Sequence, residues 1–164
     1  MSNLLVQNIK HTNGTTAQTI DSSGRVAKPI AVGFKIGATG HNASSPVNGI
    51  ITQFNNLRTS HCDFNDGSYN TSTCVYTVPV AGIYVVGFNI FAYQELTVEA
   101  LLRLNGNVIA GMQQNGSDDA QNYESCTATT IAKCAVGDTL DCFSNNRRYH
   151  VNTSSSYFFA TLIG

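Results

Sequence analysis

The chain has 164 residues, a length that suits one domain of ordinary size. Only 12% of the residues are Lys, Arg, Asp or Glu and the formal net charge is -1, so the chain lacks a basic field for phosphates or an anionic membrane. A sequence rich in Asn, Ser, Thr and Gly but poor in charged residues is typical of an all-β protein, because helix surfaces usually carry those charges.

The first ten residues contain one short apolar run without a basic residue before it, so we expect no signal peptide. The longest mainly apolar stretch, Val78 to Ala92, is interrupted by Pro79 and Gly82 and is too short for a membrane span. We therefore expect neither membrane insertion nor nucleic-acid binding.

Residues 1–28 are predicted to form a short extended leader before a single domain of residues 29–164. Asn13-Gly14 and Asp21-Ser-Ser-Gly24 are turn signals, and residues 15–20 between them can form a short strand. Two short strands cannot bury a core of their own. We expect this segment to pack on the body of the chain, on a neighbouring copy or on a larger particle.

From Ile30 onward, short strand-like runs are separated by Gly, Asn and Asp. The candidate strands are residues 30–36, 49–54, 75–78, 83–92, 97–104, 108–112, 123–133, 139–143 and 157–163. Short strands at this spacing predict a two-sheet sandwich.

Two of these runs carry more specific signals. Residues 96–104 alternate between core-facing and solvent-facing positions, as in a half-buried strand. The following Asn105-Gly106 fits a type I′ turn, which predicts an antiparallel hairpin with residues 107–112. The run Ile83 to Ala92 is instead apolar at both parities. This predicts a strand covered on both faces, the second face by another subunit.

Five cysteines make an odd number, so at least one is unpaired within the chain. Without an export signal, we expect reduced thiols. Cys126, Cys134 and Cys142 are spaced eight residues apart, which favours neighbouring strands over the close pairs that zinc sites use.

A spaced set of aromatic and turn residues lies between Gly67 and Asn89. Its members are Tyr69, Asn70, Thr73, Tyr76, Pro79, Gly82 and Tyr84. This stretch resembles the motif Tyr-Asp-x-x-Thr-Gly-x-Phe-x-x-Pro-x-x-Gly-x-Tyr-x-Phe of the globular C1q-like domain in the C1q/tumour necrosis factor (TNF) superfamily. Residues 132–140 resemble the family's Leu-x-x-Gly-Asp-x-Val turn, and residues 156–163 its closing strand.

The resemblance implies a ten-stranded, two-sheet jelly roll that assembles as a homotrimer. Two positions depart from the family pattern. Cys74 and Ala160 stand where the family usually has Gly. Because a side chain disfavours positive φ, we expect the turn before Val75 not to adopt that conformation.

A second resemblance concerns residues 13–26, Asn-Gly-Thr-Thr-Ala-Gln-Thr-Ile-Asp-Ser-Ser-Gly-Arg-Val. This segment is similar to the leader of structural proteins from tailed bacteriophages, especially marine and cyanobacterial phages. The similarity implies a virion protein that is assembled in the host cytoplasm. Residues 1–28 would then contact other virion proteins.

The two-sided apolar strand and the family resemblance together suggest a trimer interface that includes Tyr84, Phe88 and Phe91. Plain core packing is the alternative for these three rings. A second candidate site is the basic and aromatic cluster Arg147, Arg148, Tyr149 and His150, predicted on a loop before the last strand. Its arginines could bind carboxylate or phosphate groups of a host polysaccharide, and a solvated loop is the alternative.

We expect no enzyme, because the chain has no nucleophile elbow, phosphate loop or dinucleotide fingerprint. The four histidines lack metal-ligand spacing, so no histidine metal site and no cofactor is expected. Members of the resembled family sometimes hold calcium, and two loop pairs, Asp63 with Asp66 and Asp118 with Asp119, could supply oxygen ligands. Solvated turn residues are the alternative.

The function predicted from these features is a non-enzymatic, trimeric virion structural protein. It would serve as a tail-fibre tip, a decoration protein or a host-recognition subunit, with a host cell-surface polysaccharide or protein as partner. The alternative is a secreted or surface C1q-like lectin or signalling ligand of a cellular organism. A glycan-cleaving enzyme needs two carboxylates facing each other across a cleft, and no such pair stands out.

Overall fold

The computed structural model describes residues 7–14, 16–27, 31–42, 47–93, 98–114, 123–147, 149–151 and 153–163. The chain divides into two compact units, residues 1–31 and residues 32–164. Strands dominate both units, and the helical element among the described residues is a single 3-10 turn, η1 (Thr59–His61). No helix in the described ranges is long and apolar enough to cross a bilayer.

The first unit is a three-stranded antiparallel sheet. Its strands are β1 (Asn8–Lys10), β2 (Thr16–Ile20) and β3 (Val26–Ala27), in that order across the sheet. The expected strand between the two turn signals is present as β2, and it has a partner on each side. No residue of this unit whose burial is described is fully buried, so the sheet has no core of its own.

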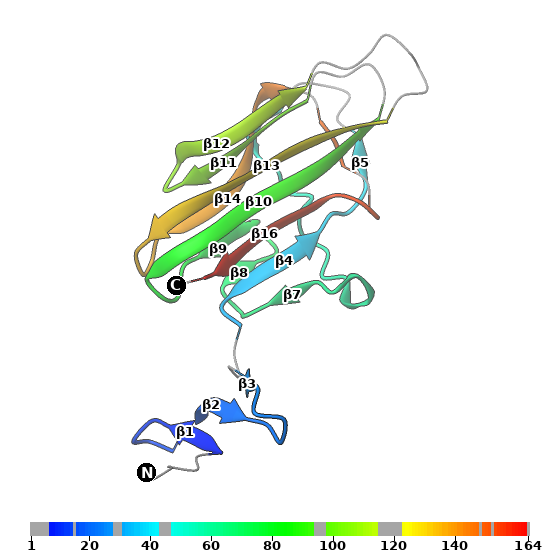
Figure 1. Ribbon diagram of the computed structural model, residues 1–164. Helices are drawn as coiled ribbons and strands as arrows, with labels where there is room; N and C mark the ends of the chain where they lie inside the picture. The colour runs from blue at the N-terminus through cyan, green and yellow to red at the C-terminus, as the bar shows by residue number, and fades with distance from the viewer. Residues whose placement is uncertain are drawn as a thin grey trace. The chain divides into compact units, whose positions relative to one another are not determined.

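The second unit contains two larger antiparallel sheets (Figure 1). The five-stranded sheet has, in spatial order, β13 (Tyr123–Cys134), β10 (Gly82–Tyr93), β16 (Tyr157–Leu162), β4 (Gly33–Gly37) and β7 (Phe64–Asn65). The six-stranded sheet has β12 (Asn107–Gln114), β11 (Val98–Leu104), β14 (Thr139–Arg147), β9 (Val75–Thr77) and β8 (Tyr69–Asn70), with β6 (Val47–Ile50) also paired to β14. A two-stranded sheet joins β5 (His41–Asn42) to β15 (His150–Val151).

The chain crosses repeatedly between the two larger sheets, from β10 to β11 and from β12 to β13. This connectivity is that of the predicted jelly roll. Each expected strand has a counterpart, and the added two-residue strands β5, β7, β8 and β15 bring the labelled number above ten. The run 49–54 differs most, because β6 ends at Ile50 and the chain then turns while Phe54 stays buried in the core.

An aromatic cluster joins the two sheets in the core. The ring of Phe34 on β4 lies 4.4 Å from Tyr69 and 4.8 Å from Tyr76, which come from the opposite sheet. Phe158 on β16 completes the cluster at 4.9 Å from Phe34. Both tyrosine hydroxyls are satisfied, since Tyr69 donates to the Phe54 carbonyl and Tyr76 donates to the Asp66 carboxylate.

Two turns test the expectations about backbone conformation. Asn105 and Gly106 have φ values of 52° and 78°, as the type I′ turn requires, and β11 pairs with β12 across it, which confirms the hairpin. The expectation for Cys74 is wrong, because its φ is 57°. The Cys74 N–H donates to the Asn70 carbonyl, and its buried thiol donates to the Phe54 carbonyl at 3.2 Å, so local contacts hold the conformation without glycine.

We predict that Asn105→Ala lowers the free energy of unfolding by about 1–2 kcal/mol. Asn tolerates positive φ, and the Asn105 side chain also accepts from the Thr139 N–H at 2.9 Å and donates to Asp138 at 2.8 Å. The matched control is Asn107→Ala, whose amide makes one contact of 3.5 Å, with an expected change within about 0.5 kcal/mol. Urea unfolding of both variants measures these changes, and an equal loss of unfolding free energy in the two variants would contradict the prediction.

Candidate functional site

Strand β10 has two different faces. The side chains of Tyr84, Val86, Phe88 and Ile90 point into the core and are buried, whereas those of Ile83, Val85 and Asn89 are half-buried on the outer face of the five-stranded sheet. The prediction that Tyr84 and Phe88 contact a neighbouring subunit is therefore wrong, because the two-residue period of the strand places both rings inside one chain. The Phe91 side chain lies outside the described part of the chain.

The outer face of the five-stranded sheet is defined by cross-strand rows. Val85 lies between Ile131 and Thr161, and Asn89 lies between Thr127 and Tyr157. Ile131 is 66% exposed, which is unusual for an isoleucine within a long paired strand. We call this surface, with its centre at Val85, Phe159 and Ile131, the outer face.

A glycine makes the centre of the outer face flat. Gly87 pairs with Thr129 on one side and with Phe159 on the other. A Cβ atom at Gly87 would stand 2.7 Å from the Phe159 ring and 2.7 Å from the Thr129 hydroxyl oxygen. The Phe159 ring therefore lies across β10 at the one position where no side chain obstructs it.

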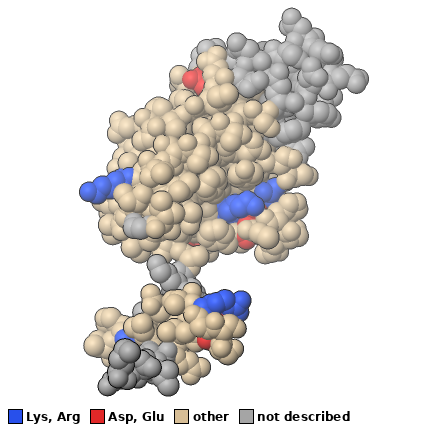
Figure 2. All heavy atoms as spheres, in the orientation of Figure 1, with Lys and Arg blue, Asp and Glu red and all other residues tan. Residues whose placement is uncertain are grey.

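Polar groups border this apolar centre. The Thr127 hydroxyl donates to Asn89 Oδ1 at 2.6 Å, and the Lys35 ammonium lies 5.5 Å from the centre of the Tyr157 ring. Figure 2 shows that charged side chains are sparse on the visible face of the described residues of the second unit. An apolar centre with a polar border is the usual composition of a protein interface.

The predicted recognition cluster does not form one exposed loop. Tyr149 is 2% exposed and its hydroxyl donates to Gln53 Oε1 at 2.5 Å, so its assignment to receptor binding is wrong. Arg147 ends β14 opposite Val47, and His150 pairs with Asn42 in the small sheet. The side chains of Arg147 and His150, and the whole of Arg148, lie outside the described part.

The strand directions define two ends of the second unit. The Leu162 N–H donates to the Val32 carbonyl and the Ile163 N–H to the Ile83 carbonyl, so the chain enters and leaves at the start of β10. Strands β10, β12 and β14 all end at the opposite end (Figure 1). Strand β7 lies at the edge of the five-stranded sheet, because it pairs with β4 alone.

The carboxylates considered for calcium have other partners. Asp66 accepts from the Gly33 N–H at 2.7 Å, from the Ser68 N–H at 2.8 Å and from the Tyr76 hydroxyl at 2.9 Å. Asp63 pairs with Arg58 at 2.8 Å. These contacts give both carboxylates a role in holding loops, while Asp118 and Asp119 lie outside the described residues.

The five thiols are unpaired in the structure. Cys62 is exposed, and the other four are buried. Burial raises the pKa of Cys126 to about 11 and also raises the pKa of Cys142, so these thiols stay protonated at neutral pH. Cys126 and Cys134 both lie on β13 rather than on neighbouring strands, and Cys142 lies on β14.

Comparison with known proteins places the fold. The sequence matches no family model and no curated protein. Among solved structures, the globular domain of zebrafish complement 1qA is similar with a TM-score of 0.57 and 14% identity, over 81% of this chain and 98% of that chain. The structure of Eiger TNF from S. frugiperda is similar with a TM-score of 0.54 and 13% identity, over 82% and 93% of the two chains.

These similarities, together with the sheet order, show that the chain has a C1q/TNF-like jelly-roll fold. The sequence resemblance to this superfamily is thus confirmed for the fold. At these levels of identity the neighbours describe architecture and not activity.

Because Tyr149 is buried, its substitution should destabilise the fold, whereas substitution of a surface residue should not. We expect Tyr149→Ala to lower the free energy of unfolding by about 3 kcal/mol or more, because it leaves a cavity and an unpaired Gln53 amide oxygen. Tyr149→Phe removes only the hydroxyl and should cost about 1 kcal/mol. Denaturant unfolding of the two variants measures both losses. A Tyr149→Ala protein as stable as the parent would contradict the buried position of this residue.

Proposed function

We propose that the chain is a non-enzymatic virion structural protein that works as a homotrimer. The observation that carries the trimer is the outer face, where Ile131 is 66% exposed and the Phe159 ring lies on Gly87. Isolated exposed apolar residues are common, but a flat apolar centre on a paired sheet is typical of a surface that another subunit covers.

The kind of fold supports three-fold assembly. C1q/TNF-like domains are often trimeric. A ring closes when each subunit presents two different complementary surfaces, and the wide outer face of the five-stranded sheet provides room for both. The outer-face residues Val85, Ile131 and Phe159 replace Tyr84 and Phe88 as the proposed interface residues.

The first unit is proposed to attach the trimer to other virion proteins. None of its residues whose burial is described is buried, and Ile9 and Val26 are 48% and 60% exposed. A small sheet without a core needs a partner to be stable. The similarity of residues 13–26 to phage leaders supports a partner within a phage particle, which would be assembled in the host cytoplasm.

Host recognition is proposed at the end where β10, β12 and β14 terminate, away from the entry and exit of the chain. Arg147, Arg148 and His150 remain candidates for contact with a host polysaccharide or protein, and Tyr149 no longer belongs to the set. Guanidinium groups suit the carboxylates and phosphates of cell-surface polymers.

The alternative is a lectin or signalling ligand of a cellular organism. It is favoured by the solved neighbours, a vertebrate complement domain and an insect TNF, which come from cellular organisms. The leader similarity favours the virion role. Neither role needs a catalytic residue or a cofactor.

We predict that Ile131→Lys converts the trimer to monomers, because it places an unpaired charge in the centre of the proposed interface. Val108→Lys is the matched control, since Val108 is 57% exposed on β12 of the other sheet. Light scattering at micromolar concentration should give a molecular mass of three times 17.6 kDa for the parent and the control, and of 17.6 kDa for Ile131→Lys. A monomeric parent, or equal masses for both variants, would contradict the proposed interface.

The virion role predicts the genetic and physical context of the chain. Its gene should lie among capsid and tail genes, and mass spectrometry of the purified particles should detect the protein. A gene among cellular genes, joined to an export signal, would favour the alternative.

A further inference from the structure

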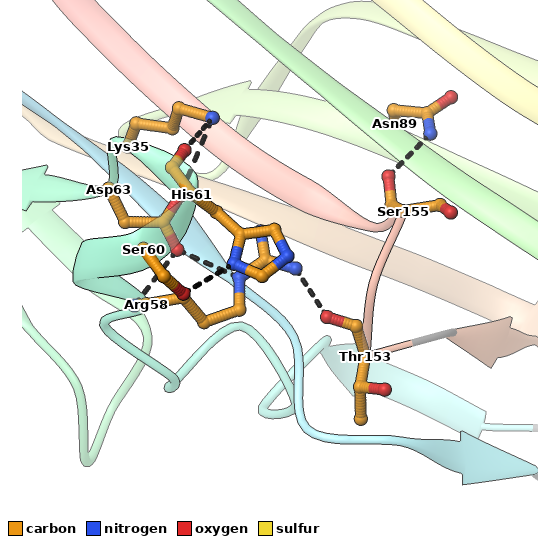
Figure 3. A network of polar contacts seen from close by, with 8 residues as sticks. All are labelled: Lys35, Arg58, Ser60, His61, Asp63, Asn89, Thr153 and Ser155. Carbon is orange, nitrogen blue, oxygen red and sulfur yellow. Dashed lines mark hydrogen bonds and ion pairs between the residues drawn. The ribbon is translucent and has the colours of Figure 1, made fainter.

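A buried ion pair lies against the outer side of β4, outside the core (Figure 3). The Asp63 side chain is fully buried and that of Arg58 is 8% exposed. The backbone N–H and the Nε of Arg58 donate to the same carboxylate oxygen, at 3.0 and 2.8 Å. A Cβ at Gly37 would overlap the Arg58 guanidinium, so this pair is possible because β4 ends in glycine.

The pair connects two loops to the sheet. Arg58 Nη1 donates to the Thr153 carbonyl, which belongs to the segment before β16. On the other side, Lys35 Nζ lies 3.5 Å from Asp63 Oδ1 and donates to the His61 carbonyl at 2.9 Å. Asp63 Oδ1 has no hydrogen-bond partner among the described residues, and Lys35 Nζ is the cationic group that faces it, while Arg58 pairs with the other carboxylate oxygen.

The polar contacts continue across the outer face. Two residues after Thr153, the Ser155 carbonyl accepts from the Asn89 side-chain amide at 2.8 Å, and Asn89 Oδ1 accepts from Thr127 at 2.6 Å. Polar contacts, joined through the short segment 153–155, thus run from Lys35 on β4 to Thr127 on β13. Figure 3 shows the part of this series from Lys35 to Asn89.

We infer that the Arg58–Asp63 pair is a positioning element of the subunit interface. It holds the segment 153–155 in place and, through that segment, the Asn89 and Thr127 side chains at the border of the outer face. This inference rests on the proposed trimer. A buried ion pair is a poor source of net stability, because apolar residues of similar volume often do as well, but it fixes the geometry of the groups that it joins.

The charge of Asp63 is what holds Arg58. Burial of Asp63 acts to raise its pKa, but the Arg58 hydrogen bonds, the Arg58 charge and Lys35 outweigh it and keep the pKa below the ordinary value. The groups that face the carboxylate are Arg58 and Lys35, with His61 in the adjoining turn. A carboxyl group with a lowered pKa stabilises the folded state when it is ionised. This stabilisation is complete above the ordinary Asp pKa of about 4, and it is lost as the pH falls through the lowered pKa.

The test compares Asp63→Asn with Asp141→Asn in the full chain. Asp141 is the matched control, because it forms a bidentate ion pair with Arg103 on the other sheet and its side chain is 7% exposed. Asp63→Asn should speed amide exchange in residues 153–157 and raise the trimer dissociation constant roughly tenfold. Asp141→Asn should change neither quantity. Equal effects of the two variants, or unchanged exchange in residues 153–157, would overturn the inference.

The double variant Asp63→Asn with Arg58→Met separates positioning from stability. It leaves no unpaired buried charge, so its melting temperature should recover toward that of the parent. Exchange in residues 153–157 should stay fast, because the Thr153 carbonyl has lost its donor. If both quantities recover together, the pair is merely structural and the inference fails.

Two further measurements keep the test decisive. If Asp63→Asn does not fold, Lys35→Gln, at a side chain that is 32% exposed, should cause a smaller shift of the dissociation constant in the same direction. No shift would count against the inference. If the parent chain is monomeric, the proposed trimer and its positioning element both fail, while the exchange data still decide whether the pair fixes residues 153–155.

Discussion

The register of β10 between β13 and β16 is the constraint on which the rest of the second unit depends. This strand pairs along its length with β13 and along six residues with β16, so its alternation is fixed from both sides. A slip of one residue would exchange the core rings of Tyr84 and Phe88 for Val85 and Asn89. The same pairing therefore determines the hydrophobic core and the composition of the outer face.

Two glycines on the outward positions of this sheet have the same physical use. Gly87 leaves space for the Phe159 ring, and Gly37 leaves space for the Arg58 guanidinium. In each case the missing side chain lets a residue from a neighbouring strand or loop lie flat on the backbone. The outer face thus has an apolar part and a polar part that are both level with the sheet, which is a favourable shape for close contact with another protein.

The architecture was predictable from the sequence because strand periods and turn residues are local signals. The Asn105-Gly106 turn and the alternation in residues 96–104 were sufficient for the β11–β12 hairpin. The sites were less predictable, because Ile83 to Ala92 is apolar at both parities and its sequence alone does not say which parity faces the core. The two arginines next to Tyr149 predict a surface position, yet its ring is buried just before β15. The contact between Arg58 and the Thr153 carbonyl was not predictable, because it joins two loops that lie 95 residues apart and carry no shared sequence signal.

The distribution of the thiols has a practical consequence for experiments on this chain. Four of the five cysteines are enclosed by the sandwich, while Cys62 is exposed next to the buried carboxylate of Asp63. A maleimide dye or a nitroxide spin label would therefore attach selectively at Cys62 without removal of the other cysteines. Such a probe would stand one residue from the ion pair, so its rotational mobility would report directly on the loop that Arg58 and Asp63 close.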